Sequence, residues 1–462
     1  MAHLRDYSYK TLAMITWPLF FELFFYMFMS SADTFMLSMY SDSSVAAVGM
    51  ANQALFFVSV MFNCVAMGTS VLMTQNYGAK RPEAAKKIAS MSIYVNLAFG
   101  LFISLLIFTF GGFLLKFMNT PAEIYETSHS YLKIVGSMLF LAALGPVSSA
   151  ILRSSGDTKT PMKIVLFGNA LNILGNALFI FGLFGFPAIG PVGVALSTVF
   201  ARFVQVIIAF TIIFTRLKIS WRFQFDRHSF KNILAIGVPG ALEQFSYSGS
   251  QIFLTAFVAT LGVASITTRT YVNNITMFVY LFAASVSQAN ELMVGHMVGA
   301  QLKDLAYKRV LRVDLIAQSV SAVLGFAVFA AGPLLLPIFT SDPDVIALGQ
   351  QAMLIIAILE PGRAMNLAFV GALRATGNAR VPMVVGILGM WLIAVPVAYI
   401  LAIPLGLGLI GIYIGMMADE WVRGLAFLVI WRRKNWMNRS NIQLRSEEEI
   451  MQQDELGVVP MA

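Results

Sequence analysis

Apolar stretches follow one another along most of the chain and are separated by short polar loops. Each stretch holds about 20 residues or more, the length at which an α-helix crosses a hydrocarbon core of about 30 Å. The pattern therefore predicts twelve membrane-spanning helices. Their approximate limits are residues 11–38, 45–75, 90–115, 130–152, 162–184, 192–215, 233–260, 265–298, 313–338, 348–373, 383–404 and 407–431.

Composition and charge agree with a membrane protein. Of the 462 residues, 58% are hydrophobic and only 12% are charged, far from the averages of soluble domains. Lysine and arginine collect in alternate loops, as in "KRPEAAKK" at 80–87 and "WRRKNW" at 431–436. By the positive-inside rule these loops are cytoplasmic, so we expect a multi-pass protein of the cell (inner) membrane with both termini in the cytoplasm. The net charge of +8 then requires no nucleic-acid partner.

Several chemical signatures are missing from the sequence. A single cysteine, Cys64, excludes an internal disulfide, and the four histidines are too dispersed to suggest a metal site. No G-x-x-x-x-G-K-[ST] phosphate loop and no nucleophile–base motif stands out. We therefore expect no enzyme, no catalytic residue and no cofactor, and uphill transport would draw on an ion gradient.

An internal repeat is the most informative feature of the chain. "AILRSSGDTKTPM" at 150–162 matches "GALRATGNARVPM" at 371–383, which puts Arg153 opposite Arg374, a displacement of 374 − 153 = 221 residues. At the same displacement "WPLFFE", with Pro18, meets "VPGALE", and "YGAKRPEAAKK" meets "VGAQLKDLAYK". Agreement at one displacement in three separate places indicates two homologous halves.

The repeat predicts the domain organisation. Each half holds six crossings, so both halves have the same orientation and are related by an axis along the membrane normal, as in secondary transporters built from parallel repeats. We predict an N-terminal six-helix lobe at 1–220, a C-terminal six-helix lobe at 221–438, and a polar cytoplasmic tail at 439–462. A central cleft would lie between the lobes, and we expect a monomer in the lipid bilayer.

Four polar residues of the N-terminal half lie at a similar depth in their predicted helices. Helix geometry puts Asp33 about 8 Å and Asn176 about 9 Å below the outer helix ends, with Thr198 about as deep. Asn172 lies one turn from Asn176 on the same face. Their oxygen atoms make the four residues a candidate cation or proton site. Two structural alternatives stay open: the asparagines hydrogen-bond neighbouring helices, or Asp33 reaches outer water.

The six-plus-six plan and several sequence stretches resemble the multidrug and toxic compound extrusion family. The stretches are "ADTFMLSMY", "YGAKRPEAAKK", "ILRSSGDTKTPM" and "NALNILGNALFIFGLFGFPAIGPVGVALST", and the resemblance covers nearly the whole chain. It implies a cation-coupled antiporter that expels amphipathic, often cationic compounds by alternating access. It matches the family's acid in the first helix to Asp33, its N-x-x-x-[DN] pair to Asn172 and Asn176, and a hydroxyl to Thr198, although several relatives carry aspartate at position 176.

Asp33 would then be the titrating or sodium-binding carboxylate, with H⁺ or Na⁺ as the coupling ion. A sodium ion would be held by Asp33, Asn172, Asn176 and Thr198, and drug release would compete with ion binding through Asp33. In the same helix Pro18 removes one backbone hydrogen bond and permits bending. Pro18 is therefore a candidate hinge.

The C-terminal half does not repeat this site, because the displacement of 221 carries Asp33 onto a leucine. Its candidate residues for substrate or coupling are Glu243, Glu360, Arg363, Asp419 and Glu420. The resemblance puts Arg363 where some relatives carry a sodium-binding aspartate, which argues against a sodium site there. Glu360 and Arg363 are three residues apart, and Asp419 and Arg423 four apart, so each pair can form an ion pair on one helix. Such pairs would either stabilise the helices or take part in transport.

We predict an all-α secondary active antiporter that exports amphipathic, often cationic organic compounds, such as drugs, toxins or metabolites, in exchange for protons or sodium. The alternative is a flippase for a lipid-linked saccharide or another lipid, which would share the architecture. A flippase cleft should carry several cationic side chains for a diphosphate. Away from the lower helix ends the sequence offers few, notably Arg202, Arg269 and Arg363.

Overall fold

The computed structural model describes residues 6–220, 223 and 225–438, and these residues are almost entirely helical. The N-terminal half consists of α1 (Tyr9–Ser38), α2 (Asp42–Gly78), α3 (Pro82–Phe117), α4 (Ala122–Ser137), α5 (Leu139–Ser154), α6 (Lys159–Phe181), the short η2 (Leu183–Gly185) and α7 (Pro191–Arg216). The C-terminal half consists of α8 (Arg227–Thr260), α9 (Val263–Gly299), α10 (Lys303–Leu335), η3 (Leu336–Ile338), α11 (Pro343–Ala375), α12 (Arg380–Gly389), the π-helical η4 (Met390–Ala394), α13 (Val395–Ala402), α14 (Gly408–Arg432) and η5 (Asn435–Asn438). The predicted tail at 439–462 lies outside the described residues.

The described helices account for twelve crossings. Nine are long and apolar enough to span a membrane, and α4 with α5, bent by 51°, makes a tenth. The helices α8 and α14, of 34 and 25 residues, have comparable lengths but carry buried or half-buried polar residues such as Glu243 and Asp419. The predicted all-α membrane fold is confirmed.

One helix differs from its prediction. The span expected at 130–152 is broken at Met138, between α4 and α5. The Phe140 N–H donates to the Ser104 hydroxyl of α3 at 3.1 Å, so a side chain of a neighbouring helix satisfies an amide at the break. This contact is between helices, and the hydrophobic pattern of one helix holds no sign of it.

Local signals set several helix ends. Ser8, Ser41 and Asp226 accept hydrogen bonds from backbone N–H groups in the first turns of α1, α2 and α8, as N-cap residues do. Gly182 takes a left-handed conformation, with φ 67°, and ends α6 at Phe181. The helix therefore ends three residues before the end of the predicted span of 162–184 and also begins three residues before its start.

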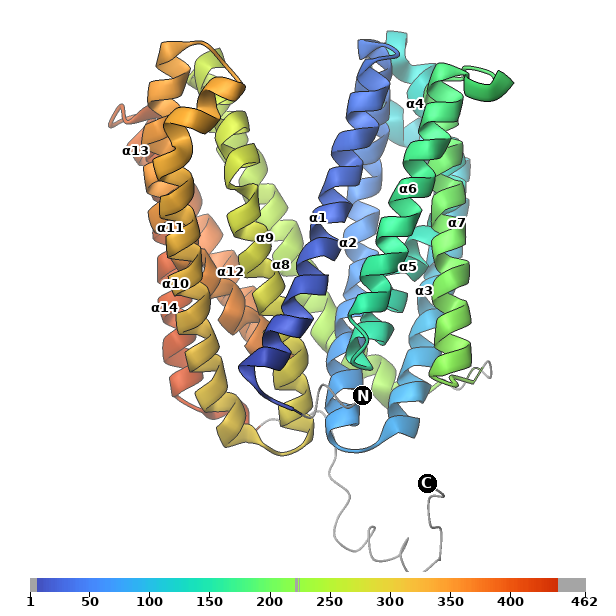
Figure 1. Ribbon diagram of the computed structural model, residues 1–462, viewed down its shortest axis with the longest axis vertical. Helices are drawn as coiled ribbons and strands as arrows, with labels where there is room; N and C mark the ends of the chain where they lie inside the picture. The colour runs from blue at the N-terminus through green and yellow to red at the C-terminus, as the bar shows by residue number, and fades with distance from the viewer. Residues whose placement is uncertain (1–5, 221–222, 224, 439–462) are drawn as a thin grey trace, which may run out of the picture.

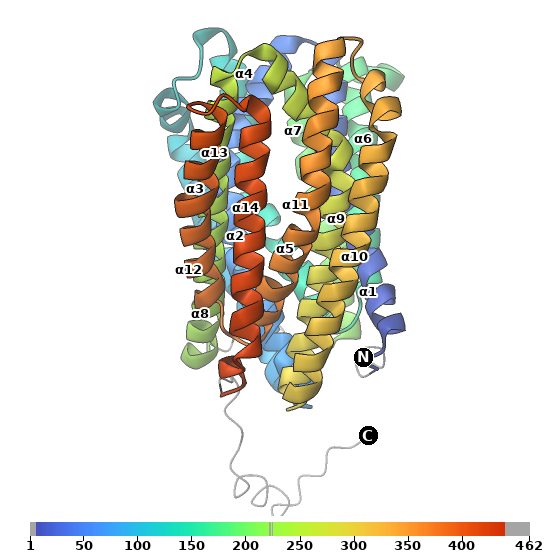
Figure 2. The ribbon, with the colours of Figure 1, turned by 90° about the vertical axis from the view of Figure 1, so that its left-hand side faces the viewer.

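The repeat is visible in the backbone and in the arrangement of the helices. Lys80 and Gln301, 221 residues apart, both have positive φ, and so do Gly156 and Gly377. Figure 1 shows α1 to α7 in one bundle and α8 to α14 in the other; the bundles approach each other where α2 and α9 end, and diverge toward the opposite end. In Figure 2 the C-terminal bundle, coloured yellow-green to red, lies in front of the other. The division at residues 220 and 221 stays a proposal.

The first helix of each half packs against both bundles. Near its start α1 buries Leu12 and Ile15 in the core of the C-terminal half, whereas Leu37 lies in the core of the N-terminal half. In α8 the opposite holds, because Ile233 and Ile236 are buried among residues of α2, α3 and α5. The segment of α1 that packs in the C-terminal bundle and the segment of α8 that packs in the N-terminal bundle are equivalent in the repeat, since 233 − 12 = 221 and 236 − 15 = 221. The bundles are therefore interlocked at the end that carries the basic loops.

Candidate functional site

The four residues predicted for the N-terminal site lie together in the structure. Asn176 Nδ2 of α6 donates to Asp33 Oδ1 of α1 at 2.6 Å and lies 3.1 Å from the amide of Asn172, which lies 3.1 Å from the Thr198 hydroxyl of α7. Asn172 and Asn176 are 0% exposed and Thr198 is buried, while Asp33 is half-buried. Three helices thus contribute to one polar cluster, at the shared depth that helix geometry predicts.

The Asn172 side chain can present either end of its amide to Asp33. One terminal atom lies 2.8 Å from Asp33 Oδ1 and the other lies 3.1 Å from Thr198 Oγ1. With Nδ2 toward Asp33, the ionised carboxylate accepts hydrogen bonds from both asparagines. With Oδ1 toward Asp33, two oxygen atoms lie 2.8 Å apart, and a proton on the carboxyl group or a cation bound beside both oxygens would make this arrangement favourable. The same side chains therefore accommodate a free and a cation-loaded carboxyl group.

The oxygen atoms of the cluster suit a hard cation as well as a proton. Asn176 Oδ1 is buried and has no hydrogen-bond partner among the described residues. Asp33, Asn172 and Thr198 add a carboxylate, an amide oxygen and a hydroxyl within reach of one another. Oxygen ligands with one negative charge fit Na⁺, so these four residues could hold it.

Two residues that the sequence analysis did not assign adjoin this cluster. Tyr131 of α4 is buried, and its hydroxyl lies next to the side chains of Thr198 and Asn52. Arg202 of α7 interacts with the charge of Asp33. A lone tyrosine in an apolar stretch does not indicate a site, so the sequence could not predict Tyr131. Arg202 lies four residues after Thr198 and therefore on the same helix face, and this spacing could have assigned it to the cluster.

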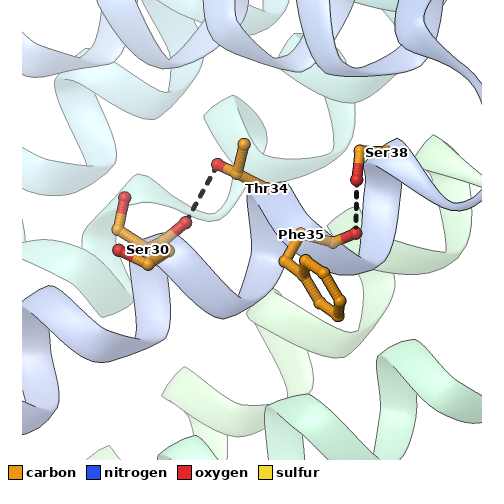
Figure 3. Close-up of a pocket in the computed structure, with 5 residues that line it drawn as sticks. Ser30, Thr34, Phe35 and Ser38 are labelled. Atoms are coloured by element: carbon orange, nitrogen blue, oxygen red, sulfur yellow. Dashed lines mark hydrogen bonds between the residues drawn. The ribbon is translucent and has the colours of Figure 1, made fainter. Parts of the chain in front are cut away.

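A shallow cavity beside the upper half of α1 is separate from this cluster. Figure 3 shows its lining of serine, threonine and phenylalanine side chains. These residues are Ser30, Ser31, Thr34, Phe35 and Ser38. Thr34 Oγ1 donates to the Ser30 carbonyl at 3.0 Å and Ser38 Oγ to the Phe35 carbonyl at 2.8 Å. These hydroxyls are satisfied by their own helix, and Asp33 is not part of the lining.

Four of the five predicted C-terminal residues form a buried ionic network between α11 and α14. Arg363 Nη1 contacts Glu360 Oε1 at 2.5 Å, and its Nε donates to Glu420 Oε1 at 3.3 Å. Arg423 donates to both oxygens of Asp419, at 2.8 and 2.6 Å, and its Nη2 lies 3.3 Å from Glu420 Oε2. Both predicted ion pairs are therefore formed. Glu420 joins them, which helical spacing alone did not predict because the contact with Arg363 is between helices.

The network holds more acidic than basic groups. Glu360, Asp419 and Glu420 face two guanidinium groups, so one negative charge is left over when all are ionised. Asn366 Nδ2 donates to Glu420 Oε2 at 2.6 Å, but Glu360, 1% exposed, keeps Oε2 without a hydrogen-bond partner among the described residues. An uncompensated buried charge costs several kcal/mol. The network therefore favours uptake of a proton or another positive group.

Among the described residues Glu243 forms no ion pair with this network, although its charge acts on Arg423. Its Oε2 lies 3.8 Å from Arg374 Nη2, and in the other half Glu22 Oε2 lies 3.8 Å from Arg153 Nη1. The two pairs are equivalent in the repeat, since both partners are displaced by 221 residues. Pro18 is buried inside the continuous helix α1, and bending at this position stays a prediction.

Comparison with known protein families agrees with the repeat. A family model described as MatE matches residues 18–178 and again residues 239–400. The two matches begin 239 − 18 = 221 residues apart and together cover most of the chain. The family model thus detects the same two halves as the internal repeat.

Two curated proteins are similar over nearly their whole length. "Uncharacterized transporter YisQ" of Bacillus subtilis is 40% identical over 92% of this chain and 94% of its own. "Probable multidrug resistance protein NorM" of Thermotoga maritima is 29% identical over 96% of both chains.

Solved structures share the fold. A crystal structure described as MATE in the bent conformation superposes with a TM-score of 0.83 at 22% identity, over 94% of this chain and 96% of that chain. One described as the outward-facing conformation of a multidrug resistance MATE family transporter gives 0.81 at 22% identity, over 92% and 95%. At this level of identity the likeness extends to the fold alone.

Proposed function

The chain belongs to the MatE family of multidrug and toxin efflux transporters, and from this premise we propose that it is a secondary antiporter coupled to protons or sodium. Its substrates would be amphipathic, often cationic organic compounds, exported by alternating access across the cell (inner) membrane. The observation that carries the proposal is the buried contact of Asp33 with Asn176 and Asn172, next to Thr198. A carboxylate held among amides and a hydroxyl in a membrane-spanning bundle favours an ion-binding role over a structural one.

Asp33 would alternate between two states. Ionised, it accepts hydrogen bonds from both asparagines; protonated, it would donate to the amide oxygen of Asn172, and with Na⁺ it would share the ion with that oxygen. Loading removes the negative charge that attracts a cationic substrate, so ion binding from outside would promote substrate release. Arg202 would interact more strongly with the ionised form.

The C-terminal network would supply the second charged site of the cycle. With three carboxylates around two guanidinium groups, it lacks one positive charge. We propose that the cationic group of the substrate, or a second coupling ion, provides this charge near Glu360. Glu360, Arg363, Asp419 and Glu420 would act together, and Glu243 would act through its pair with Arg374.

The orientation of the chain would make this an outward-facing state. The bundles lie close where α2 and α9 end (Figure 1), and these ends lead into the basic loops that begin at Lys80 and Gln301. The positive-inside rule supports a cytoplasmic position for these loops. The closed end would then face the cytoplasm, and both termini would lie on that side.

The test is gradient-driven efflux from substrate-loaded proteoliposomes, with proton and sodium gradients imposed separately. We expect one gradient to accelerate export by the wild type, and Asp33→Asn to lower the coupled rate about tenfold or more. The matched control is Asp42→Asn, which removes an exposed carboxylate nine residues further along the chain. Acceleration by neither gradient would contradict antiport, and equal rates for Asp33→Asn and the wild type would remove Asp33 from the mechanism.

A further inference from the structure

The helices α2 and α9 cross at their cytoplasmic ends with no space between their backbones. A Cβ atom on Gly78 would lie 2.0 Å from the His296 carbonyl oxygen, and one on Gly299 would lie 1.9 Å from the Gln75 carbonyl oxygen. The two contacts are equivalent in the repeat, because 299 − 78 = 221 and 296 − 75 = 221. The bundles thus meet at a pseudo-twofold interface in which each contact occurs twice.

One arginine from each half reaches across this interface. Arg153 Nη1 of α5 donates to Gln288 Oε1 of α9 at 3.2 Å, and Arg374 Nη1 of α11 lies 3.8 Å from Met67 Sδ of α2. Both arginines and both partners are displaced by 221 residues, since 288 − 67 = 221. The two arginines therefore occupy equivalent positions, each extending from its own half to the other.

A carboxylate from the first helix of each half accompanies each arginine. Glu22 of α1 lies 3.8 Å from Arg153, and Glu243 of α8 lies 3.8 Å from Arg374. These distances are too long for direct hydrogen bonds, so the charges attract without locking the side chains together. Glu22 follows the segment of α1 that packs in the C-terminal bundle, and Glu243 follows the segment of α8 that packs in the N-terminal bundle. Each carboxylate therefore lies where its helix passes from one bundle to the other.

We propose that Glu22, Arg153, Glu243 and Arg374 form a twofold latch that holds the cytoplasmic ends of the bundles together and opens when the transporter turns inward. The latch rests on alternating access, as the proposed function does, but on neither candidate ion site. The carboxylates are positioning residues, because they hold each guanidinium group at the partner half. Since the two ion pairs belong to opposite halves of the interface, weakening both should shift the conformational equilibrium more than weakening either.

A fifth charged residue makes the two ion pairs unequal. Glu291 of α9 interacts electrostatically with Arg374 and, less strongly, with Arg153, whereas the repeat puts Ser70 at the equivalent position of α2. When Glu243 is neutralised, Arg374 keeps Glu291 as an acidic partner from its own half. When Glu22 is neutralised, Arg153 also keeps the attraction of Glu291, in this case from the opposite half. Each single substitution should therefore open the latch less than the double variant.

The test places one thiol at the interface. Cys64 is the only cysteine, so Cys64→Ser with Thr74→Cys gives a single reporter; Thr74 is 1% exposed, and a Cβ atom on Gly295 would lie 2.4 Å from its Oγ1. A membrane-impermeant maleimide is added to inside-out vesicles, and the labelling rate is measured without substrate or ion gradient. We expect about a fivefold increase for Glu22→Gln and a larger one for Glu22→Gln with Glu243→Gln. An unchanged rate in the double variant would overturn the latch.

Two controls separate the latch from general loosening. Glu83→Gln removes the carboxylate of an exposed ion pair with Lys86 at the same end of the molecule, and should label at the wild-type rate; an equal rise there would contradict the proposal. Glu22→Asp keeps the charge and covers the case in which Glu22→Gln fails to fold. If Glu22→Asp labelled as fast as Glu22→Gln, shape rather than charge would control the interface. Because labelling requires no transport, its result does not depend on whether Asp33→Asn loses coupled efflux.

Discussion

The crossing of α2 and α9 predicts that Gly299→Ala disfavours the state described here, which we propose to be outward-facing. The added Cβ atom would lie 1.9 Å from the Gln75 carbonyl oxygen, whereas carbon and oxygen atoms in contact are normally about 3.3 Å apart. The two backbones must therefore separate by about 1.4 Å, the difference between these distances. Overpacking of this kind costs about 1–3 kcal/mol.

This cost applies only to the state in which the two helices touch. A penalty of about 1–3 kcal/mol on the outward-facing state alone raises the ratio of inward-open to outward-facing molecules by a factor of roughly 5 to 150. The maleimide assay with Thr74→Cys should show this as faster labelling from the cytoplasmic side. Gradient-driven efflux should fall, because the cycle must pass through the disfavoured state.

Gly49→Ala is the matched control, since Gly49 also lies in a long crossing helix, α2, and an added Cβ atom would have nothing within 4 Å. It should leave both labelling and efflux at wild-type rates. Gly78→Ala should reproduce Gly299→Ala, because the two positions are equivalent at the interface. Wild-type labelling and efflux in Gly299→Ala would show that the close crossing is not required for the transport cycle.

Three further predictions concern the two charged clusters and a helix end. Asn176→Ala should lower coupled efflux less than Asp33→Asn in the same proteoliposomes, because one ligand is lost while the carboxylate remains. In detergent, Arg363→Ala should lower the free energy of unfolding by about 3–5 kcal/mol, since its carboxylate partners stay buried without it; Glu360→Gln, which removes the excess charge, should not lower it. Hydrogen bonds from Ser229 hold the pKa of Asp226 below its usual range. Asp226→Ala should therefore cost about 1 kcal/mol of unfolding free energy at pH 7, and the difference from the wild type should shrink as the pH falls below about 4, through that lowered pKa.

The sequence could predict the N-terminal cluster because the depth of each residue in the membrane follows from its position within its own helix. The rise per residue of an α-helix converts position into depth, and Asp33, Asn176 and Thr198 lie at one depth in three apolar stretches. Depth alone does not say which helices are neighbours, and the family resemblance supplied that step. The resulting hydrogen bonds from α1 through α6 to α7 are what the combined reasoning predicts, and their role in ion binding stays a proposal.

Contacts between helices explain what the sequence could not predict. Glu420 of α14 contacts Arg363 of α11, and no spacing along one helix contains that contact. Beside the bend at Met138, the Phe140 N–H donates to the hydroxyl of Ser104 in α3. The exchange of the α1 and α8 segments between the bundles also escaped prediction, because Leu12 and Ile15 look like any other apolar residues of a spanning helix.

The halves keep the same glycines and arginines where they touch, and they differ in the two charged clusters. A pseudo-twofold interface can pack only if both sides present matching groups, so the arginines and glycines that meet there recur at a displacement of 221 residues. No such constraint applies inside each bundle, and there the chemistry differs. Thr198 and Arg202 of α7 are equivalent to Asp419 and Arg423 of α14, since 419 − 198 = 221 and 423 − 202 = 221. The two clusters thus occupy corresponding places in the halves and share an arginine, but the acid comes from α1, as Asp33, in one half and from α14 itself in the other. A motion that pivots about the shared interface would move both clusters equally. If the two clusters bind different ligands, each ligand could therefore favour or oppose the same conformational change of the transporter.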